Sequence, residues 1–217
     1  MKRVIVFIDF DGTTAAESAS NRLLDRFAIG DWRELDRKLD AKEISFRECV
    51  IGQFSMLSGR REEMIQFVQN EIHLRAGFKE FVNFCQDRKY DIHIVAEALD
   101  FMIEALFERE SIKGVPIFSD RALFKTGQFS GLELRHFRSD CVCALGNCKG
   151  GHVRAHHDRY DFKIYIGDGT NDLCGARHSD FVFARRRLAE LCKTQEIDYV
   201  PFEDFFIIQE ELTQLGL

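Results

Sequence analysis

Long apolar runs and prolines are scarce in this chain of 217 residues, and each scarcity excludes a class of protein. No run approaches the roughly 20 apolar residues that a membrane-spanning helix needs, so we expect no membrane partner. Only two prolines occur, and we find no repeat, low-complexity tract or flexible linker. The net charge of −6, with acidic and basic residues interspersed, predicts no nucleic-acid partner.

A disulfide framework is also not expected. The chain has seven cysteines, an odd number, and a strand pattern begins after only Met1, Lys2 and Arg3, which does not resemble a secretion signal. These features predict reduced thiols and a cytoplasmic location. Nothing in the sequence pattern indicates an oligomeric state.

Four short runs rich in β-branched and aromatic residues are typical of strands buried on both faces. Helical patterns separate them; for example, Phe78, Phe81, Val82 and Cys85 form an apolar stripe. Alternating strands and helices predict an α/β fold with a parallel sheet covered on both faces. The four predicted strands are residues 4–8, 91–96, 162–168 and 180–184.

The segment between the first two predicted strands is too long for an ordinary crossover. It is charged and helical in period, and we interpret residues 15–75 as a helical cap inserted into a core made of residues 1–14 and 76–217. Further along, residues 119–134 predict short strands with turns at the Thr126-Gly127 and Ser130-Gly131 pairs.

Two carboxylates follow the first strand, in the stretch VIVFIDFDGTTA. Asp9 and Asp11 are two residues apart and therefore project to one side of an extended segment, while Gly12 permits a sharp turn after them. Burying either carboxylate without a partner is costly. A cation, a chemical task or solvent must therefore compensate for their proximity.

A second acidic loop follows a later strand, in the stretch IGDGTNDLCGA. It presents Asp168, Asn171 and Asp172, and ligands of parallel sheets bind beyond the carboxyl ends of the strands. Two acidic loops at neighbouring strand ends predict an oxygen-rich pocket suited to Mg²⁺. Lys149, at an expected helix start, can supply a positive charge to a phosphate.

These motifs carry a resemblance to a known family. DFDGTT, Lys149 and GDGTND resemble the first, third and fourth motifs of the haloacid dehalogenase (HAD) superfamily phosphatases, and the inserted segment resembles the cap of their phosphoserine-phosphatase-like branch. Within that branch, FVNFCQDRKYDIHIV, LDF, CK and the final segment are most similar to the 2-hydroxy-3-keto-5-methylthiopentenyl-1-phosphate phosphatases of methionine salvage. The resemblance implies a Rossmann-like core with a helical cap.

The resemblance also implies a Mg²⁺-dependent phosphomonoesterase that acts on a small phosphorylated metabolite through an aspartyl-phosphate. Asp9 would be the nucleophile and Asp11 the general acid and base. Lys149 would pair with the phosphoryl oxygens. The metal would be held by Asp9, the Asp11 backbone carbonyl and Asp168, with Asp172 close by; Thr13 and Asn171 would orient phosphate or metal.

The second motif departs from the family pattern. Ala96 stands where these phosphatases carry a serine or threonine that binds the phosphoryl group, and Glu97 follows where glycine is commoner. A lost donor of this kind costs about 10²–10³ in rate. A catalytically weakened phosphate-binding or regulatory protein is therefore the alternative.

Ser18 and Gln53 replace the glutamate and arginine that the branch uses for phosphoserine, so phosphoserine is not the expected substrate.

Three cysteines precede Lys149, in the stretch CVCALGNCKGG. Cys141, Cys143 and Cys148 lack a second clean pair of the kind that structural zinc sites use, so reduced thiols are the favoured interpretation and zinc the alternative. His152 and His156 share a helical face but have no glutamate between them of the kind found in H-E-x-x-H zinc sites. Cys174 is expected to be a core or surface residue.

Overall fold

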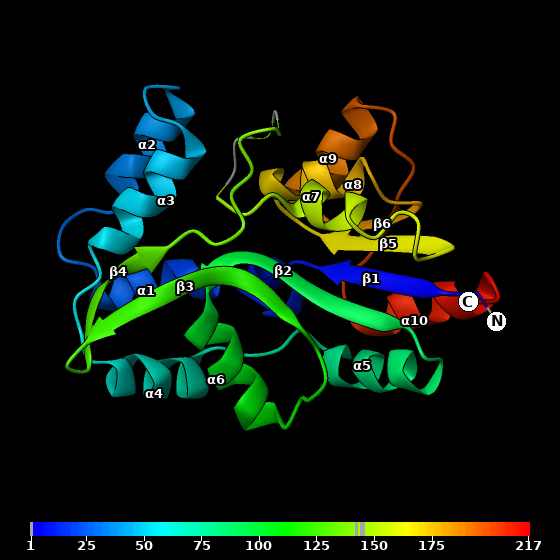
Figure 1. Ribbon diagram of the computed structural model, residues 1–217, viewed down its shortest axis with the longest axis horizontal. Helices are drawn as coiled ribbons and strands as arrows, with labels where there is room; N and C mark the ends of the chain where they lie inside the picture. The colour runs from blue at the N-terminus through cyan, green and yellow to red at the C-terminus, as the bar shows by residue number, and fades with distance from the viewer. Residues whose placement is uncertain (1, 142, 144–145) are drawn as a thin grey trace.

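The computed structural model describes residues 2–141, 143 and 146–217. Within these residues, a seven-stranded sheet has the order β4-β3-β2-β1-β5-β6-β7, and only the β3–β4 hairpin is antiparallel (Figure 1). The strands are β1 (Val4–Ile8), β2 (Asp91–Leu99), β3 (Ile117–Lys125), β4 (Gln128–Glu133), β5 (Phe162–Gly167), β6 (Phe181–Ala184) and β7 (Val200–Pro201).

Strand β1 lies at the centre of the sheet and carries the first acidic loop. All five of its residues are buried, and it pairs in parallel with β2 on one side and β5 on the other. Ile8 lies opposite both Ile94 and Ile166 in this register. The carboxyl ends of β1 and β5, and so the two acidic loops that follow them, are therefore neighbours.

The predicted strands agree with the structure except at their ends. The second predicted strand, 91–96, was too short, because β2 continues to Leu99 through an irregularity in its pairing with β3. The Ser130-Gly131 pair does not form the predicted turn: it lies inside β4, where the pairing shifts register, and Gly131 has a φ of 144°. The single turn of this hairpin is at Thr126-Gly127.

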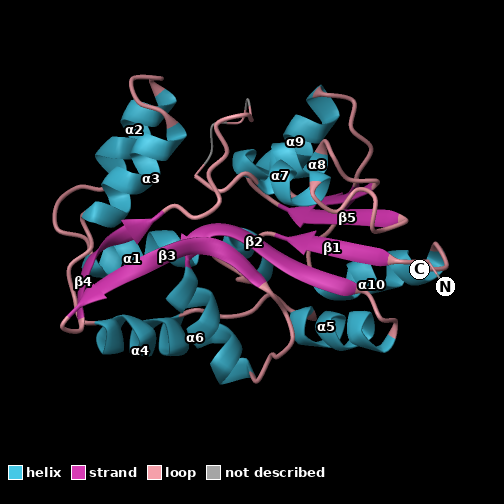
Figure 2. Ribbon diagram, in the orientation of Figure 1, coloured by secondary structure: helices cyan, strands magenta, loops and turns pink. Residues whose placement is uncertain are grey.

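Helices cover both faces of the sheet (Figure 2). On one face, α5 and α10 pack together, and the rings of Phe78 and Phe205 meet at 5.0 Å between centroids. No helix that the structure describes is both long and apolar enough to cross a bilayer. The helices of this core are α5 (Phe78–Asp87), α6 (Asp100–Glu110), α7 (Lys149–Arg154), α8 (Leu173–Ala176), α9 (Arg186–Thr194) and α10 (Phe205–Gln214).

Four of the five α-helices that the structure describes between β1 and β2 lie within residues 15–75, the range predicted for the cap. Serines cap the N-termini of two of them. The Ser18 hydroxyl accepts from the backbone N–H of Asn21, and Ser45 forms a capping box with Glu48. Helices α2 and α3 pack together and stand beside the long β3–β4 hairpin (Figure 1). The four are α1 (Ala19–Phe27), α2 (Arg33–Asp40), α3 (Phe46–Ser55) and α4 (Arg61–Glu71).

Arg75 anchors the loop after β1 where the chain returns from the inserted helices. The side chain is only 9% exposed. Its guanidinium donates to the backbone carbonyls of Thr13 (2.9 Å), Gly12 (2.6 Å), Ala16 (3.0 Å) and Glu203 (3.2 Å). One cation therefore joins the acidic loop to the C-terminal segment.

We expect Arg75→Ala to lower the free energy of unfolding by about 3 kcal/mol or more, because each buried carbonyl left without a donor costs about 1–3 kcal/mol. Urea unfolding of the variant and the wild type measures this difference. Arg159→Ala, at an exposed arginine, is the matched control and should change the free energy little. Equal losses in the two variants would contradict an anchoring role for Arg75.

Candidate active site

Asp9 follows the last residue of β1 and is almost completely buried. Its backbone N–H donates to the Ile166 carbonyl at 3.0 Å, and its carbonyl accepts from the Thr14 hydroxyl at 2.7 Å. The loop then turns at Gly12, which has a φ of 74°. A Cβ there would lie 2.3 Å from Asp168 Oδ2, so glycine is required for the two acidic loops to approach each other.

Lys149 is the first residue of α7, and its side chain is fully buried between two carboxylates. Its Nζ lies 2.5 Å from Asp9 Oδ1 and 2.6 Å from Asp172 Oδ1. Burial alone disfavours the ammonium, but attraction by Asp172 and Asp9 outweighs it and raises the Lys149 pKa. Lys149 is therefore charged at neutral pH.

The Asp172 carboxylate is fully engaged by hydrogen bonds. One oxygen accepts from Lys149 and from the Tyr165 hydroxyl at 2.8 Å; the other accepts from the backbone N–H groups of Asp168 (2.9 Å) and Gly169 (2.8 Å). A carboxylate with four donors has little left to offer a cation. Asp172 therefore orients Lys149 and the Asp168 loop.

Asp9, Asp168 and Asp172 form a compact cluster, as predicted from the two acidic motifs. Each offers one oxygen, and these oxygens all lie within 4.8 Å of one another. Burial, with added repulsion from Asp172, raises the pKa of Asp9 well above its ordinary value and that of Asp168 to about 6. Lys149 and Arg186, whose guanidinium lies 3.6 Å from Asp168 Oδ2, do not neutralise three carboxylates, and a hard divalent cation fits the oxygens of Asp9 and Asp168.

Asp11 faces a different direction from the cluster. Its two carboxylate oxygens accept from the Ser20 N–H at 2.9 Å and the Ser20 hydroxyl at 2.5 Å, at the first turn of α1. Burial raises the Asp11 pKa, and the bonds from Ser20 oppose that rise. The Asp11 side chain is thus absent from the carboxylate cluster and is placed to exchange a proton.

The remaining predicted residues divide into two groups. Thr13 is buried, and its hydroxyl donates to Asp168 Oδ1 at 3.3 Å, which orients a carboxylate of the cluster. Ala96 is buried among apolar side chains. Glu97 lies nearer the charged groups: its oxygens accept from the Asn147 N–H (3.4 Å) and the Asn171 side chain (3.3 Å). Position 97, rather than 96, therefore presents its side chain to the site.

A cavity of about 190 Å³ lies between the loops of the core and the inserted helices. Asp11, Glu97 and Asn171 line it from the core side. Ser18 and side chains of α1, α2 and α3 line the rest, and no lysine or arginine is among the lining residues that the structure describes. A larger surface hollow of about 650 Å³, between α1 and α4, contains none of the predicted site residues.

Sequence reasoning missed three supporting residues. Tyr165 donates to Asp172, Ser20 donates to Asp11, and the Asn147 side chain donates to the Ala96 carbonyl at 2.9 Å. Tyr165 alone had a signal, because it places a hydroxyl within a buried strand, where such a group needs a hydrogen-bond partner. Ser20 and Asn147 lie in helical and loop segments whose patterns do not indicate a partner.

Relatives of known description match nearly the whole chain. A protein of Bacillus mycoides named 2-hydroxy-3-keto-5-methylthiopentenyl-1-phosphate phosphatase is 31% identical over 97% of this chain and 96% of its own length. The protein of that name from Brevibacillus brevis is 28% identical over 99% of this chain and 97% of its own.

Solved structures show the same fold. A phosphoserine phosphatase trapped as an analogue of its phospho-aspartyl intermediate has a TM-score of 0.72 at 16% identity, over 99% of both chains. A HAD family hydrolase of Salmonella enterica has a TM-score of 0.76 at 16% identity, over 94% of this chain and 69% of its own. The family model described as "Putative Phosphatase" matches residues 4–201. The chain therefore belongs to this phosphatase family, and its fold is the capped α/β fold of the HAD phosphatases.

Proposed function

We propose that the protein hydrolyses the phosphate monoester of a small cytoplasmic metabolite, with Asp9 as the nucleophile. The observation that carries this proposal is the buried cluster in which Lys149 bridges Asp9 and Asp172 while Asp168 lies within 4.8 Å. Asp11 adds a group that pure binding would not need, since its raised pKa suits proton transfer.

In the first step, an Asp9 oxygen attacks phosphorus and the bond from phosphorus to the ester oxygen breaks. Asp11 gives its proton to the departing alcohol oxygen. Lys149 holds the Asp9 carboxylate in place and offers positive charge to the phosphoryl oxygens. The product of this step is an aspartyl-phosphate and a free alcohol.

In the second step, the ionised Asp11 takes a proton from water and the resulting hydroxide attacks phosphorus. The acyl phosphate bond to Asp9 breaks and inorganic phosphate leaves. Ser20 keeps Asp11 oriented throughout, because both carboxylate oxygens accept from it. Positioning and charge neutralisation, rather than further covalent chemistry, provide most of the rate.

Mg²⁺ is the cofactor that the donor set favours. Asp9 and Asp168 would hold it, with the Asp11 backbone carbonyl, whereas Asp172 has both oxygens committed to other donors. When bound, Mg²⁺ neutralises the negative charge of phosphate and carboxylates and orients the phosphoryl group.

The cavity supports an uncharged, partly apolar leaving group. The name of the relatives' substrate specifies a hydroxyl, a ketone and a methylthio group, none of them ionised. Leu24, Leu39 and Phe54 can pack against a methylthio chain, and Gln53 can donate to an oxygen of the leaving group. Phosphoserine would instead place a carboxylate where no lining lysine or arginine exists among the described residues. We therefore assign the methionine-salvage ester as the substrate.

The inserted residues 15–75 act in this proposal as the cap that selects the leaving group. The core supplies only three of the described residues that line the cavity, and the remaining lining comes from Ser18 and helices α1 to α3. A cap built this way separates selection of the alcohol from chemistry at phosphorus, because the catalytic carboxylates, Asp11 included, belong to the core loops.

We expect Asp9→Asn to abolish turnover of the methylthiopentenyl phosphate ester while the fold is retained, because an amide cannot attack phosphorus and has nearly the same volume. Phosphate release and circular dichroism measure the two properties. Asp158→Asn, at an exposed aspartate, should leave both unchanged. Turnover near the wild-type rate in Asp9→Asn would exclude covalent catalysis by Asp9.

Metal dependence is tested on protein freed of Mg²⁺ by gel filtration, then titrated with MgCl₂. Activity should be absent without Mg²⁺ and return on addition. Asp168→Asn should raise the Mg²⁺ concentration needed for half-maximal activity by at least about tenfold, because it removes one of the two carboxylates that would bind this hard cation. An Asp168→Asn titration curve that overlays the wild-type curve would place the metal elsewhere.

A weakened phosphate-binding protein is the second candidate, and Ala96 and Glu97 favour it. Burial raises the Glu97 pKa to about 7; Lys149 and the hydrogen bonds from Asn147 and Asn171 oppose the rise, and Asp172 adds to it. Burial, with added repulsion from Glu97, also raises the pKa of the Asp120 carboxyl to about 8. Glu97 is therefore neutral below about pH 7 and repels phosphate above it.

We expect the KM to rise as the pH increases through 7 in the wild type and to stay flatter in Glu97→Gln, which keeps the shape of the side chain and lacks the charge. The ester's own titration, near pH 6, affects both proteins equally and cancels in the comparison. Parallel pH profiles would show that Glu97 does not face the phosphate. Phosphate binding without turnover in both proteins would favour the binding function.

A further inference from the structure

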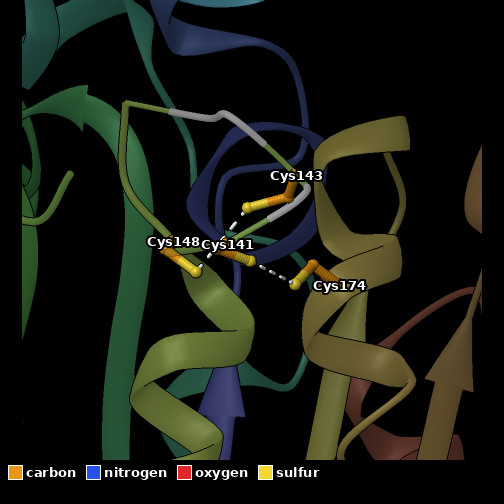
Figure 3. Close-up of side chains that lie close together, drawn as sticks. All are labelled: Cys141, Cys143, Cys148 and Cys174. Atoms are coloured by element: carbon orange, nitrogen blue, oxygen red, sulfur yellow. Dashed lines mark hydrogen bonds between the residues drawn. The ribbon is translucent and has the colours of Figure 1, made fainter. Parts of the chain in front are cut away.

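Four cysteines from three places in the sequence meet beside the candidate active site (Figure 3). Cys141 and Cys143 lie in the loop before α7, Cys148 is the N-cap of α7, and Cys174 belongs to α8. Their side chains point toward one another, and all four Sγ atoms lie within 4.8 Å of one another. None of the four has a role in the proposed hydrolysis.

The spacing of the sulfur atoms is that of ligands around a single ion. Cys141 Sγ lies 3.6 Å from Cys174 Sγ, and Cys143 Sγ lies 3.6 Å from Cys148 Sγ. A disulfide would bring two sulfurs to about 2.05 Å. Four thiolates at about 2.3 Å from a tetrahedral Zn²⁺ have sulfur atoms about 3.8 Å apart. The observed separations match the second arrangement.

We propose that Cys141, Cys143, Cys148 and Cys174 bind one structural Zn²⁺. The sequence favoured reduced thiols because three cysteines before Lys149 lacked a second pair. Cys174, 26 positions after Cys148, supplies the fourth ligand only once α7 and α8 pack together. Binding is not a redox step: the thiols release their protons and four sulfur–zinc bonds form.

The surroundings are built for a thiolate cluster. A Cβ on Gly150 would lie 2.4 Å from Cys174 Sγ, so glycine clears the space. The Gly151 N–H donates to Cys148 Sγ at 3.3 Å. Arg154 donates a hydrogen bond to Cys141 and so offsets part of the net negative charge of a tetrathiolate zinc site, whereas the charge of Arg138 is paired with Asp140.

The zinc would fix the relative position of two catalytic loops. Cys148 directly precedes Lys149, and Cys174 follows Asp172 by two residues. Lys149 Nζ and Asp172 Oδ1 are 2.6 Å apart, so a tether beside both residues stabilises the ion pair. This role needs no assumption about the substrate, and the metal site stands or falls independently of the hydrolytic function.

The test is the metal content of the full chain, produced and purified without chelators and measured by inductively coupled plasma mass spectrometry. We expect close to one zinc per chain in the wild type. Cys141→Ala and Cys174→Ala should lose most of it. Cys85→Ala, at a buried cysteine of α5 outside the cluster, is the matched control and should keep it. Zinc absent from wild type, replaced by iron, or retained in Cys174→Ala would overturn the proposal.

Cobalt tests the same site without relying on the variants to fold. Co²⁺ is added to reduced wild-type protein from which zinc has been removed. It should give the intense sulfur-to-cobalt absorption of a tetrahedral tetrathiolate site, and one equivalent of Zn²⁺ should then displace the cobalt and abolish this absorption. The oxygen ligands of the Asp9 cluster give only weak bands. Weak bands alone, or no binding, would show that the cysteines hold no metal, whatever the phosphatase activity.

Discussion

The buried ammonium of Lys149 is the interaction on which the rest of the site depends. Three carboxylates gather at the ends of β1 and β5, and without a cation their mutual repulsion and desolvation would oppose folding. Lys149 contacts two of them directly. Tyr165 and two backbone amides then complete the hydrogen bonds of Asp172, so one of the two partners of the lysine is itself held in place. A group held this firmly suits catalysis because it needs no reorganisation during reaction.

Much of the core was predictable from sequence because it depends on local pattern. Val4–Ile8 is apolar throughout, and its parallel neighbours must end on the same side, so the sequence pattern alone places Asp9 and Asp168 together. The partners of Asp11 and Cys174 could not be predicted this way. Ser20 reaches Asp11 only through the geometry of α1, and Cys174 joins the other cysteines only through the packing of α7 on α8.

The second motif shows how the two faces of a strand assign different roles to neighbouring positions. The family pattern expects a hydroxyl at Ala96, but β2 continues past this point to Leu99 and shifts its register between Val95 and Leu99. Ala96 then packs into the apolar cluster and Glu97 turns to the cavity. Ile94 and Ala96 lie in one apolar cluster and Val95 in the other, so the opposite directions of Ala96 and Glu97 follow the alternation of the strand.

The central place of β1 also has a consequence for the synthesis of the chain. Asp9 and Lys149 are 140 residues apart, and β5, the second neighbour of β1, is encoded later still. During translation, one edge of the first strand has no partner until Phe162–Gly167 leaves the ribosome, and its aspartate has no lysine. An exposed edge of this kind invites pairing with other chains. Protection of the nascent N-terminal strand is therefore a demand that this topology places on the cell.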